Sequence, residues 1–221
     1  MARDVLSREE YLDRWRELHG GYDPRSSRLV GPWLSAVHAL ASPLARVGVP
    51  PDLVTLLGLA VSGLVVWLCW LGGGWVVVAA VVVGASGLLD SIDGAVAVLS
   101  QRVTRWGAVL DSVVDRISDV LYLVAFWVVG APAWACLGAG VVLFTQEYAR
   151  ARATAVGLDD VGIITVGERP TRVIVVAMFL LGAGIYSSAA GTWATAGALV
   201  SLAVGVVALV QLLVVVRRRL S

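Results

Sequence analysis

Five aspartates stand in stretches that are otherwise long and apolar: Asp90, Asp93, Asp111, Asp115 and Asp119. An ionised carboxylate inside a membrane costs several kcal/mol on most scales, so such residues are rare and usually functional. Four of them close together would also repel one another unless cations hold them. We therefore expect the first four to form a site for divalent cations.

The spacing of these four carboxylates predicts how they meet. Asp90 and Asp93 are three residues apart and Asp111 and Asp115 four apart, so each pair shares one helix face. A short connection makes the two helices antiparallel neighbours, and both pairs lie within roughly 10 Å of the same membrane boundary at about 1.5 Å per residue. The sequence predicts a four-carboxylate cage open to the cytoplasm. Such hard oxygen ligands suit Mg²⁺ or Mn²⁺.

Small residues accompany the carboxylates. Gly94 and Ala97 follow Asp90 and Asp93 by four residues, and Gly107 precedes Asp111 by four. Missing side chains leave a slot beside the metal, which we expect to admit a ligand. The alternative is close helix packing through small residues, which is common in membranes.

The composition indicates which elements must position this site. Hydrophobic residues make up 58% of the 221-residue chain and charged residues 15%, against about 45–50% and about 25% in soluble domains. The net charge of +1 gives no basic field for nucleic acid. Two Cys and two His exclude most zinc sites. The chain is expected to be an all-α integral membrane protein.

Six stretches are long and apolar enough to span a membrane: residues 53–70, 75–99, 107–129, 133–154, 171–186 and 192–216. We expect them to form a catalytic domain over residues 49–221, preceded by a cytoplasmic region over residues 1–48. Connections with and without charge alternate strictly, and all 17 basic residues are Arg. The positive-inside rule then places both termini and the carboxylates on the cytoplasmic side of the cell membrane.

Aromatic residues and the N-terminal region fit this topology. Five tryptophans are expected to cluster at the outer interface: Trp70, Trp75, Trp127, Trp134 and Trp193. Ser7 to Glu10 forms a capping box that opens a short polar helix through about Leu18. Residues 29–47 predict an interfacial helix on the cytoplasmic leaflet. A short extra span there is disfavoured by Pro32, Pro43 and Arg46.

The aspartates and small residues together resemble the signature of the CDP-alcohol phosphotransferase family, D-x2-D-G-x2-A-R-x8-G-x3-D-x3-D. Seven of its eight positions match, and Val98 stands in place of the signature Arg. The family transfers a phosphoalcohol unit from a CDP-linked lipid to a hydroxyl acceptor and releases CMP. The resemblance also implies a homodimer.

This resemblance implies roles for the matching residues. One or two divalent ions, Mg²⁺ or Mn²⁺, would be held by the four carboxylates Asp90, Asp93, Asp111 and Asp115, and Asp115 would also be the base that takes the acceptor proton. Nucleotide-binding residues would be Gly94, Ala97, Gly107, Asp90 and Asp111.

The chain looks most similar to the actinobacterial phosphatidylinositol phosphate synthases within this family. That resemblance implies CDP-diacylglycerol as donor and favours inositol phosphate as acceptor. Its phosphate would be bound by Arg150, Arg152, Arg169 and Arg172. Arg150 and Arg152 point to different helix faces, so only one of them is expected to face the site. The alternative is that these residues only anchor the chain at the cytoplasmic surface.

Three further questions stay open. Val98 leaves the alternative of a divergent or non-catalytic family member that binds the nucleotide lipid. A divalent-cation transporter is disfavoured because the outer halves of all six stretches lack acids, so no path crosses the membrane. Asp119 and Arg116 either line the acceptor pocket or pair with each other, and pairing is favoured.

Overall fold

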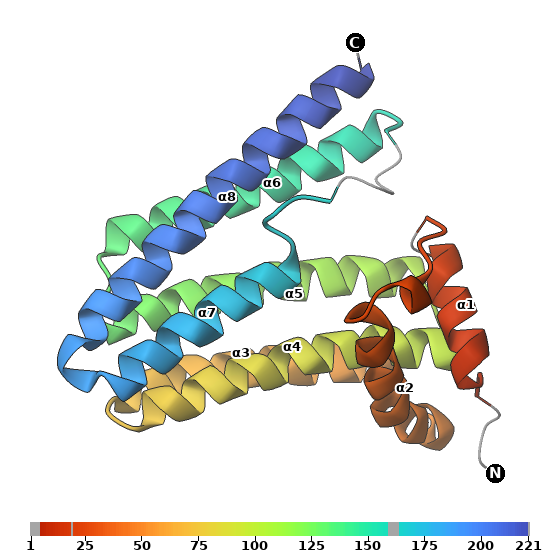
Figure 1. The fold of residues 1–221 in the computed structure, drawn as a ribbon, viewed down its shortest axis with the longest axis horizontal. Coiled ribbons are helices and arrows are strands. Elements are labelled where there is room, and N and C mark those ends of the chain that lie inside the picture. The colour runs from red at the N-terminus through yellow and green to blue at the C-terminus, as the bar shows by residue number, and fades with distance from the viewer. Residues whose placement is uncertain (1–4, 19, 159–163, 221) are drawn as a thin grey trace. The chain divides into compact units, whose positions relative to one another are not determined.

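The computed structural model describes residues 5–18, 20–158 and 164–220. The described residues form eight α-helices and two short 3₁₀ helices, with no strand among them (Figure 1). The α-helices are α1 (Arg8–Leu18), α2 (Val30–Val47), α3 (Pro51–Leu71), α4 (Trp75–Leu99), α5 (Arg105–Val129), α6 (Ala133–Ala155), α7 (Arg169–Ile185) and α8 (Ala190–Leu220). The 3₁₀ helices are η1 (Pro24–Ser26) and η2 (Ser187–Ala189). The all-helical prediction is confirmed.

Most helix ends agree with the sequence to within two residues. Helix α4 has the predicted bounds, while α3 begins at Pro51 because proline suits the first helical position, where no backbone N–H is needed. The largest departure is α8, which continues through the three terminal arginines to Leu220. Part of the predicted charged loop over residues 155–170 lies outside the described residues.

Three segments in the described part of the chain are long and apolar enough to cross a membrane: Pro51–Leu71, Trp75–Leu99 and Ser187–Leu220. Helix α7 has only 17 residues. Helix α5 contains five charged residues, which lower its hydropathy: Arg105, Asp111, Asp115, Arg116 and Asp119. The structure therefore supports a multi-pass membrane protein, and the number of six spans stays a prediction.

One compact unit comprises residues 1–60 and 86–115. Its apolar core joins Tyr11 of α1 and Val37 of α2 to Val96 and Leu99 of α4. Contacts between α1 and α2 are also polar, because the Arg8 Nε donates to Ser35 Oγ at 2.9 Å. The N-terminal region is thus packed on the helix that carries Asp90 and Asp93.

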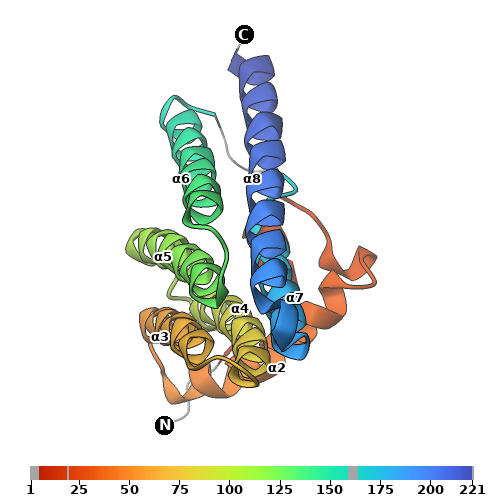
Figure 2. The same cartoon turned by 90° about the vertical axis from the view of Figure 1, so that its left-hand side faces the viewer.

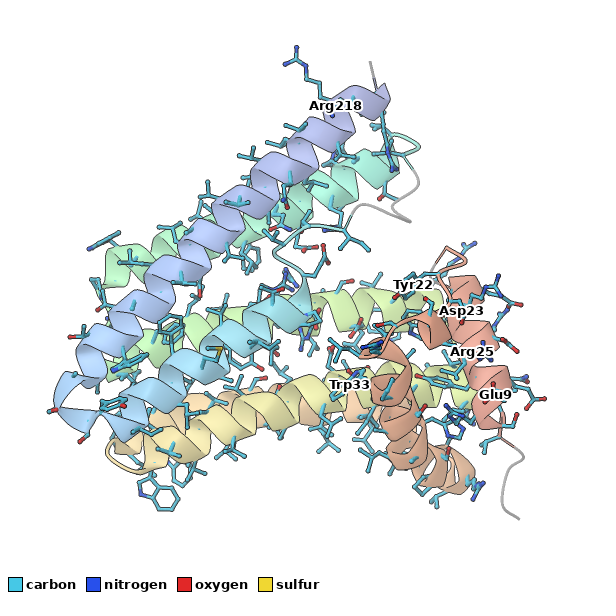
Figure 3. The ribbon with its side chains drawn as sticks, viewed as in Figure 1. Glu9, Tyr22, Asp23, Arg25, Trp33 and Arg218 are labelled. Carbon is cyan, nitrogen blue, oxygen red and sulfur yellow. The ribbon has the colours of Figure 1, made fainter. Side chains whose placement is uncertain are left out.

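The predicted capping box is present at the start of α1. The Ser7 N–H donates to the Glu10 carboxylate at 2.7 Å, and the Glu10 N–H donates to Ser7 Oγ at 3.4 Å. The hydrogen bonds from Ser7 lower the pKa of Glu10. Nearby, Arg25 pairs with Glu9 at 2.9 Å and with Asp13 at 2.9 Å. Figure 3 labels Arg25 and Glu9 in this N-terminal region.

The second compact unit comprises residues 61–85 and 116–221. Helices α6 and α7 both pack on α8, and α6 runs beside it (Figure 2). The core contains Tyr122, Phe126 and Leu180. A Cβ atom at Gly197 would lie 2.5 Å from the Phe126 ring. Glycine at this position therefore lets α8 pack closely against Phe126 of α5.

The turns between α3 and α4, α5 and α6, and α7 and α8 lie at one end of this second unit (Figure 1). Four of the five predicted belt tryptophans are exposed near these turns: Trp70, Trp75, Trp127 and Trp134. Trp193 instead stacks on Tyr186, with ring centroids 5.7 Å apart, and packs against Gly182. The exposed rings have the position expected of a membrane interface.

Candidate active site

Carboxylates from two helices of the first unit meet as the spacing predicts. Asp90 and Asp93 of α4 and Asp111 of α5 each offer an oxygen atom, and these atoms lie within 4.8 Å of one another. Asp93 is buried, whereas Asp90 and Asp111 are half-buried, so the group is partly accessible. Three carboxylates at this distance are a suitable donor set for a hard divalent cation.

Asp115 is not part of this group among the described residues. It lies one helical turn after Asp111 and is half-buried. Since residues four apart on a helix have Cβ atoms about 5–6 Å apart, both side chains of α5 need not converge on the same point. Instead of the expected cage of four carboxylates, the structure has three that converge. Asp115 follows Asp111 one turn later on α5.

A hydroxyl from α3 also reaches the carboxylates. The Thr55 side chain is buried and hydrogen-bonds to Asp93. The sequence analysis missed Thr55 because no fixed spacing relates it to Asp93, 38 positions later. The available signal was a polar side chain in the second turn of an apolar helix.

The small residues differ in the space around them. A Cβ atom at Gly94 would meet no atom within 4 Å, so Gly94 borders open space beside the carboxylates. A Cβ atom at Gly107 would lie 3.1 Å from Thr104 Oγ1 and 3.8 Å from Asp52 Oδ1. A ligand slot is thus supported at Gly94, and Gly107 is closely surrounded. Asp52, which the sequence indicated only as part of a helix start, is a second missed neighbour.

The candidate acceptor arginines lie in the second unit. Arg150 of α6 pairs with Glu168 at 3.0 Å, and Arg172 of α7 pairs with Asp119 at 3.3 Å. Arg169 begins α7 and is half-buried, whereas Arg152 is exposed. Arg150 is half-buried and Arg152 is exposed, as expected of residues on different faces of α6.

Asp119 and Arg116 pair, as favoured. The Arg116 guanidinium lies 3.2 Å from Asp119 and 3.1 Å from Glu147 of α6. Arg150 and Arg172 are close enough to Arg116 to repel its charge. Three guanidinium groups are therefore concentrated in one part of the unit.

Glu168 precedes α7 and joins these groups. Its carboxylate accepts hydrogen bonds from the Thr165 N–H and hydroxyl, both at 2.9 Å, and from Arg150. Partial burial alone would raise the pKa of Glu168, but the hydrogen bonds from Thr165 and the charge of Arg150 together lower it. Glu168 is therefore ionised at neutral pH, and it connects Thr165 in front of α7 to Arg150 of α6.

Known proteins resemble the chain over most of its length. Residues 49–217 match the family model described as CDP-alcohol phosphatidyltransferase. The phosphatidylinositol phosphate synthase of Mycobacterium tuberculosis (strain ATCC 25618 / H37Rv) is 39% identical over 156 residues, covering 66% of this chain and 68% of that protein.

Solved structures of the Mycobacterium tuberculosis synthase show the same likeness. The crystal structure with CDP-DAG bound has a TM-score of 0.62 and 31% identity, covering 80% of this chain and 92% of that chain. The crystal structure in complex with manganese and citrate has a TM-score of 0.67 and 31% identity, covering 81% of this chain and 88% of that chain.

Proposed function

Because the chain belongs to the CDP-alcohol phosphatidyltransferase family, we propose that it makes a phosphoinositol lipid from CDP-diacylglycerol and inositol phosphate. An acceptor hydroxyl oxygen forms a new bond to the phosphatidyl phosphorus, the phosphoanhydride bond to CMP breaks, and CMP leaves. The observation that carries the proposal is the convergence of Asp90, Asp93 and Asp111 within the matching signature.

The carboxylates fit the divalent metal that such a reaction needs. Asp90, Asp93 and Asp111 are hard oxygen donors that would hold Mg²⁺ or Mn²⁺, with Asp115 as a further ligand. A bound divalent ion would neutralise the diphosphate and stabilise the leaving CMP. The manganese in the structure of the mycobacterial relative supports this choice.

The remaining residues of this site would accept a proton and bind the nucleotide. A carboxylate oxygen of Asp115 would accept the proton of the acceptor hydroxyl, as a general base does. The open space at Gly94 would admit the nucleotide beside Asp90 and Asp111, with Ala97 and Gly107 as further small neighbours.

The charge of the second unit favours an acceptor that carries phosphate. Among the residues that the structure describes, four arginines and three acids are gathered there: Arg116, Arg150, Arg169, Arg172, Asp119, Glu147 and Glu168. The cluster therefore has one more guanidinium group than it has carboxylates. Arginine binds phosphate through paired hydrogen bonds. We assign Arg150, Arg169 and Arg172 to the acceptor phosphate, with the exposed Arg152 at the rim.

The membrane arrangement follows from the same proposal. Helices α3 to α8 would form six spans of a plasma-membrane protein, with both termini and the site cytoplasmic. The region over residues 1–48, including α2, would lie on the inner surface. Lipid donor and product would then keep their acyl chains in the bilayer, and the active form would be a homodimer.

An acceptor panel tests the proposal with the purified protein. CMP release from CDP-diacylglycerol is measured with inositol phosphate, glycerol 3-phosphate, serine or free inositol, with and without Mg²⁺ or Mn²⁺. We expect release only with metal and mainly with inositol phosphate. Release that is equal without metal would contradict the site, and a preference for another acceptor would contradict the substrate.

Asp115→Asn tests the base. We expect this variant to fold and to lose CMP release, while Glu17→Gln, an acid exposed on α1, retains it. A fully active Asp115→Asn would overturn the role of Asp115.

A further inference from the structure

A buried ion pair connects α5 to α7, and its arginine also reaches the segment in front of α7. The Asp119 carboxylate is only 4% exposed and lies 3.3 Å from the Arg172 Nε, while the Arg172 Nη1 donates to the Gly167 carbonyl oxygen. Asp119 thereby reaches, through one guanidinium, the residues 164–168 that we call the strap.

The strap is held by two other helices as well. Gln146 of α6 donates to Thr165 Oγ1 at 3.2 Å, and the Val166 N–H donates to Gln211 Oε1 of α8 at 3.0 Å. A Cβ atom at Gly167 would lie 2.7 Å from the Ala208 Cβ. The backbone of the strap therefore packs closely against α8 at Gly167 and is hydrogen-bonded to it at Val166.

Two contacts fix the orientation of the Arg172 guanidinium. The group is planar and rigid, so contacts at Nε and Nη1 define both its position and its plane. Neither contact engages Nη2, whose donors therefore have a set direction. A cavity in the same unit is lined by Asp119, Gln146, Gly167, Arg172 and Ser201, together with apolar side chains.

We propose that Asp119 is a positioning residue for the acceptor end of the reaction: it holds the Arg172 guanidinium and, through it, the strap. The proposal rests on the function proposed above, in which Arg172 binds the acceptor phosphate. In this proposal Asp119 acts through Arg172 and not through a contact of its own with donor or acceptor.

The chain contains a matched comparison for Asp119. Glu147 is a second carboxylate of the same ion-pair network, and its ion pair joins it to Arg116, not to Arg172. Removing the charge of Glu147 disturbs the network without releasing Arg172. Asp119→Asn and Glu147→Gln therefore separate the positioning of Arg172 from the general effect of removing one negative charge from the network, in which Asp119 is 4% exposed and Glu147 is 32% exposed.

The experiment compares kinetics of the purified full-length variants. For Asp119→Asn we expect the KM for inositol phosphate to rise by about tenfold or more, the loss expected when a charge-assisted hydrogen bond is removed. The KM for CDP-diacylglycerol should not change, and Glu147→Gln should leave both values unchanged. Asp119→Glu, which keeps the charge, should restore part of the acceptor KM. An equal effect of both charge removals, or a loss confined to kcat, would overturn the proposal.

A double variant tests whether Asp119 acts through Arg172. If it does, Asp119→Asn adds nothing to the acceptor KM of Arg172→Gln, whereas independent residues would give multiplied effects. Where Asp119→Asn does not fold, Asp119→Glu serves alone, since it keeps the charge but displaces the carboxylate by one methylene. It should raise the acceptor KM by a smaller factor.

Hydrogen exchange separates failure of this proposal from failure of the proposed function. Backbone amides of residues 164–168 should exchange faster in Asp119→Asn, and in Asp119→Glu, than in wild type or Glu147→Gln, without any acceptor present. If the wild type uses none of the phosphorylated acceptors, the proposed function fails while faster exchange still supports anchoring by Asp119. Unchanged exchange in a folded Asp119 variant would refute the anchoring.

Discussion

Gly94 and Gly167 illustrate how the same added methyl group can have opposite effects. Open space surrounds a Cβ atom at Gly94, while one at Gly167 would lie 2.7 Å from the Ala208 Cβ. Gly94 has no steric reason to be glycine within its helix. A glycine there is instead understandable if a ligand needs the space.

Gly94→Ala should therefore separate stability from activity. We expect the thermal midpoint to stay equal or rise, since replacing glycine by alanine inside a helix stabilises by up to about 1 kcal/mol. The KM for CDP-diacylglycerol should increase because the methyl group occupies nucleotide space. Gly167→Ala is the contrasting variant and should lose about 1–3 kcal/mol of stability through overpacking. Unchanged kinetics of Gly94→Ala would remove this residue from the nucleotide site.

Val98 is a residue at which the chain departs from the family signature, and the structure places it in an apolar cluster. It is 8% exposed and belongs to the apolar cluster of the N-terminal unit. A hollow beside it is lined by Glu10, Asp13, Arg14 and Glu17 of α1. An arginine at this position could bury its stem and pair with these acids.

Val98→Arg should consequently fold and release CMP at the wild-type rate. The reason is that the new guanidinium would meet the acids of α1 instead of the substrates. A large gain in CMP release would contradict this expectation. It would instead favour the alternative that the natural chain is a weakly active family member.

The carboxylates could be predicted from the sequence, but their neighbours could not. Asp90, Asp93 and Asp111 lie on helix faces fixed by their spacing, so one antiparallel pair of helices brings them together. Thr55 comes from a third helix, and only tertiary packing determines which residue of that helix meets Asp93.

At the scale of elements, Glu168 connects the strap in front of α7 to α6. This carboxylate accepts from the Thr165 N–H and from Arg150, and these contacts lower its pKa despite partial burial. A lowered pKa in the folded state means that the ionised form stabilises the fold. That contribution is complete above the ordinary pKa of about 4.3 and is lost as the pH falls through the lower, folded-state pKa.

Glu168→Gln should thus destabilise the protein in a pH-dependent manner. At pH 7 we expect a loss of about 1 kcal/mol, because a charged hydrogen bond contributes about 1.5–3 kcal/mol and solvent screens this side chain, which is 37% exposed. Thermal unfolding in detergent from pH 7 to pH 3 should show the difference from wild type shrinking. Glu17→Gln, at an exposed pair, should differ little from wild type at pH 7. A difference that grows on acidification would contradict the ionised state of Glu168.

Helix positions were the most predictable part of the fold. Long apolar runs bounded by charged or glycine-rich connections gave α4 its observed bounds, and Ser7 with Glu10 marked the start of α1. Longer-range partners were not predictable. Asp119 and Arg172 are 53 residues apart, and the sequence offered Arg116 as the nearer partner for Asp119.

At the scale of the whole molecule, the two ends of α8 provide a test of topology. Ser188 precedes this helix and Arg218 lies in its last turn, and the free cysteines Cys69 and Cys136 are buried. In intact cells, we expect an impermeant thiol reagent to label Ser188→Cys. Arg218→Cys should react only after the membrane is permeabilised. Labelling of both variants in intact cells, or the reverse pattern, would contradict cytoplasmic termini.

Helix α8 also bears on the thickness of the membrane around the protein. Its 31 residues span about 46 Å at roughly 1.5 Å per residue, whereas the hydrocarbon layer is about 30 Å thick. The surplus lets the helix stay matched to thin and thick bilayers by changing its tilt. Arg217, Arg218 and Arg219 then remain outside the hydrocarbon in either case, so lipid chain length should have little influence on how this end of the protein is seated.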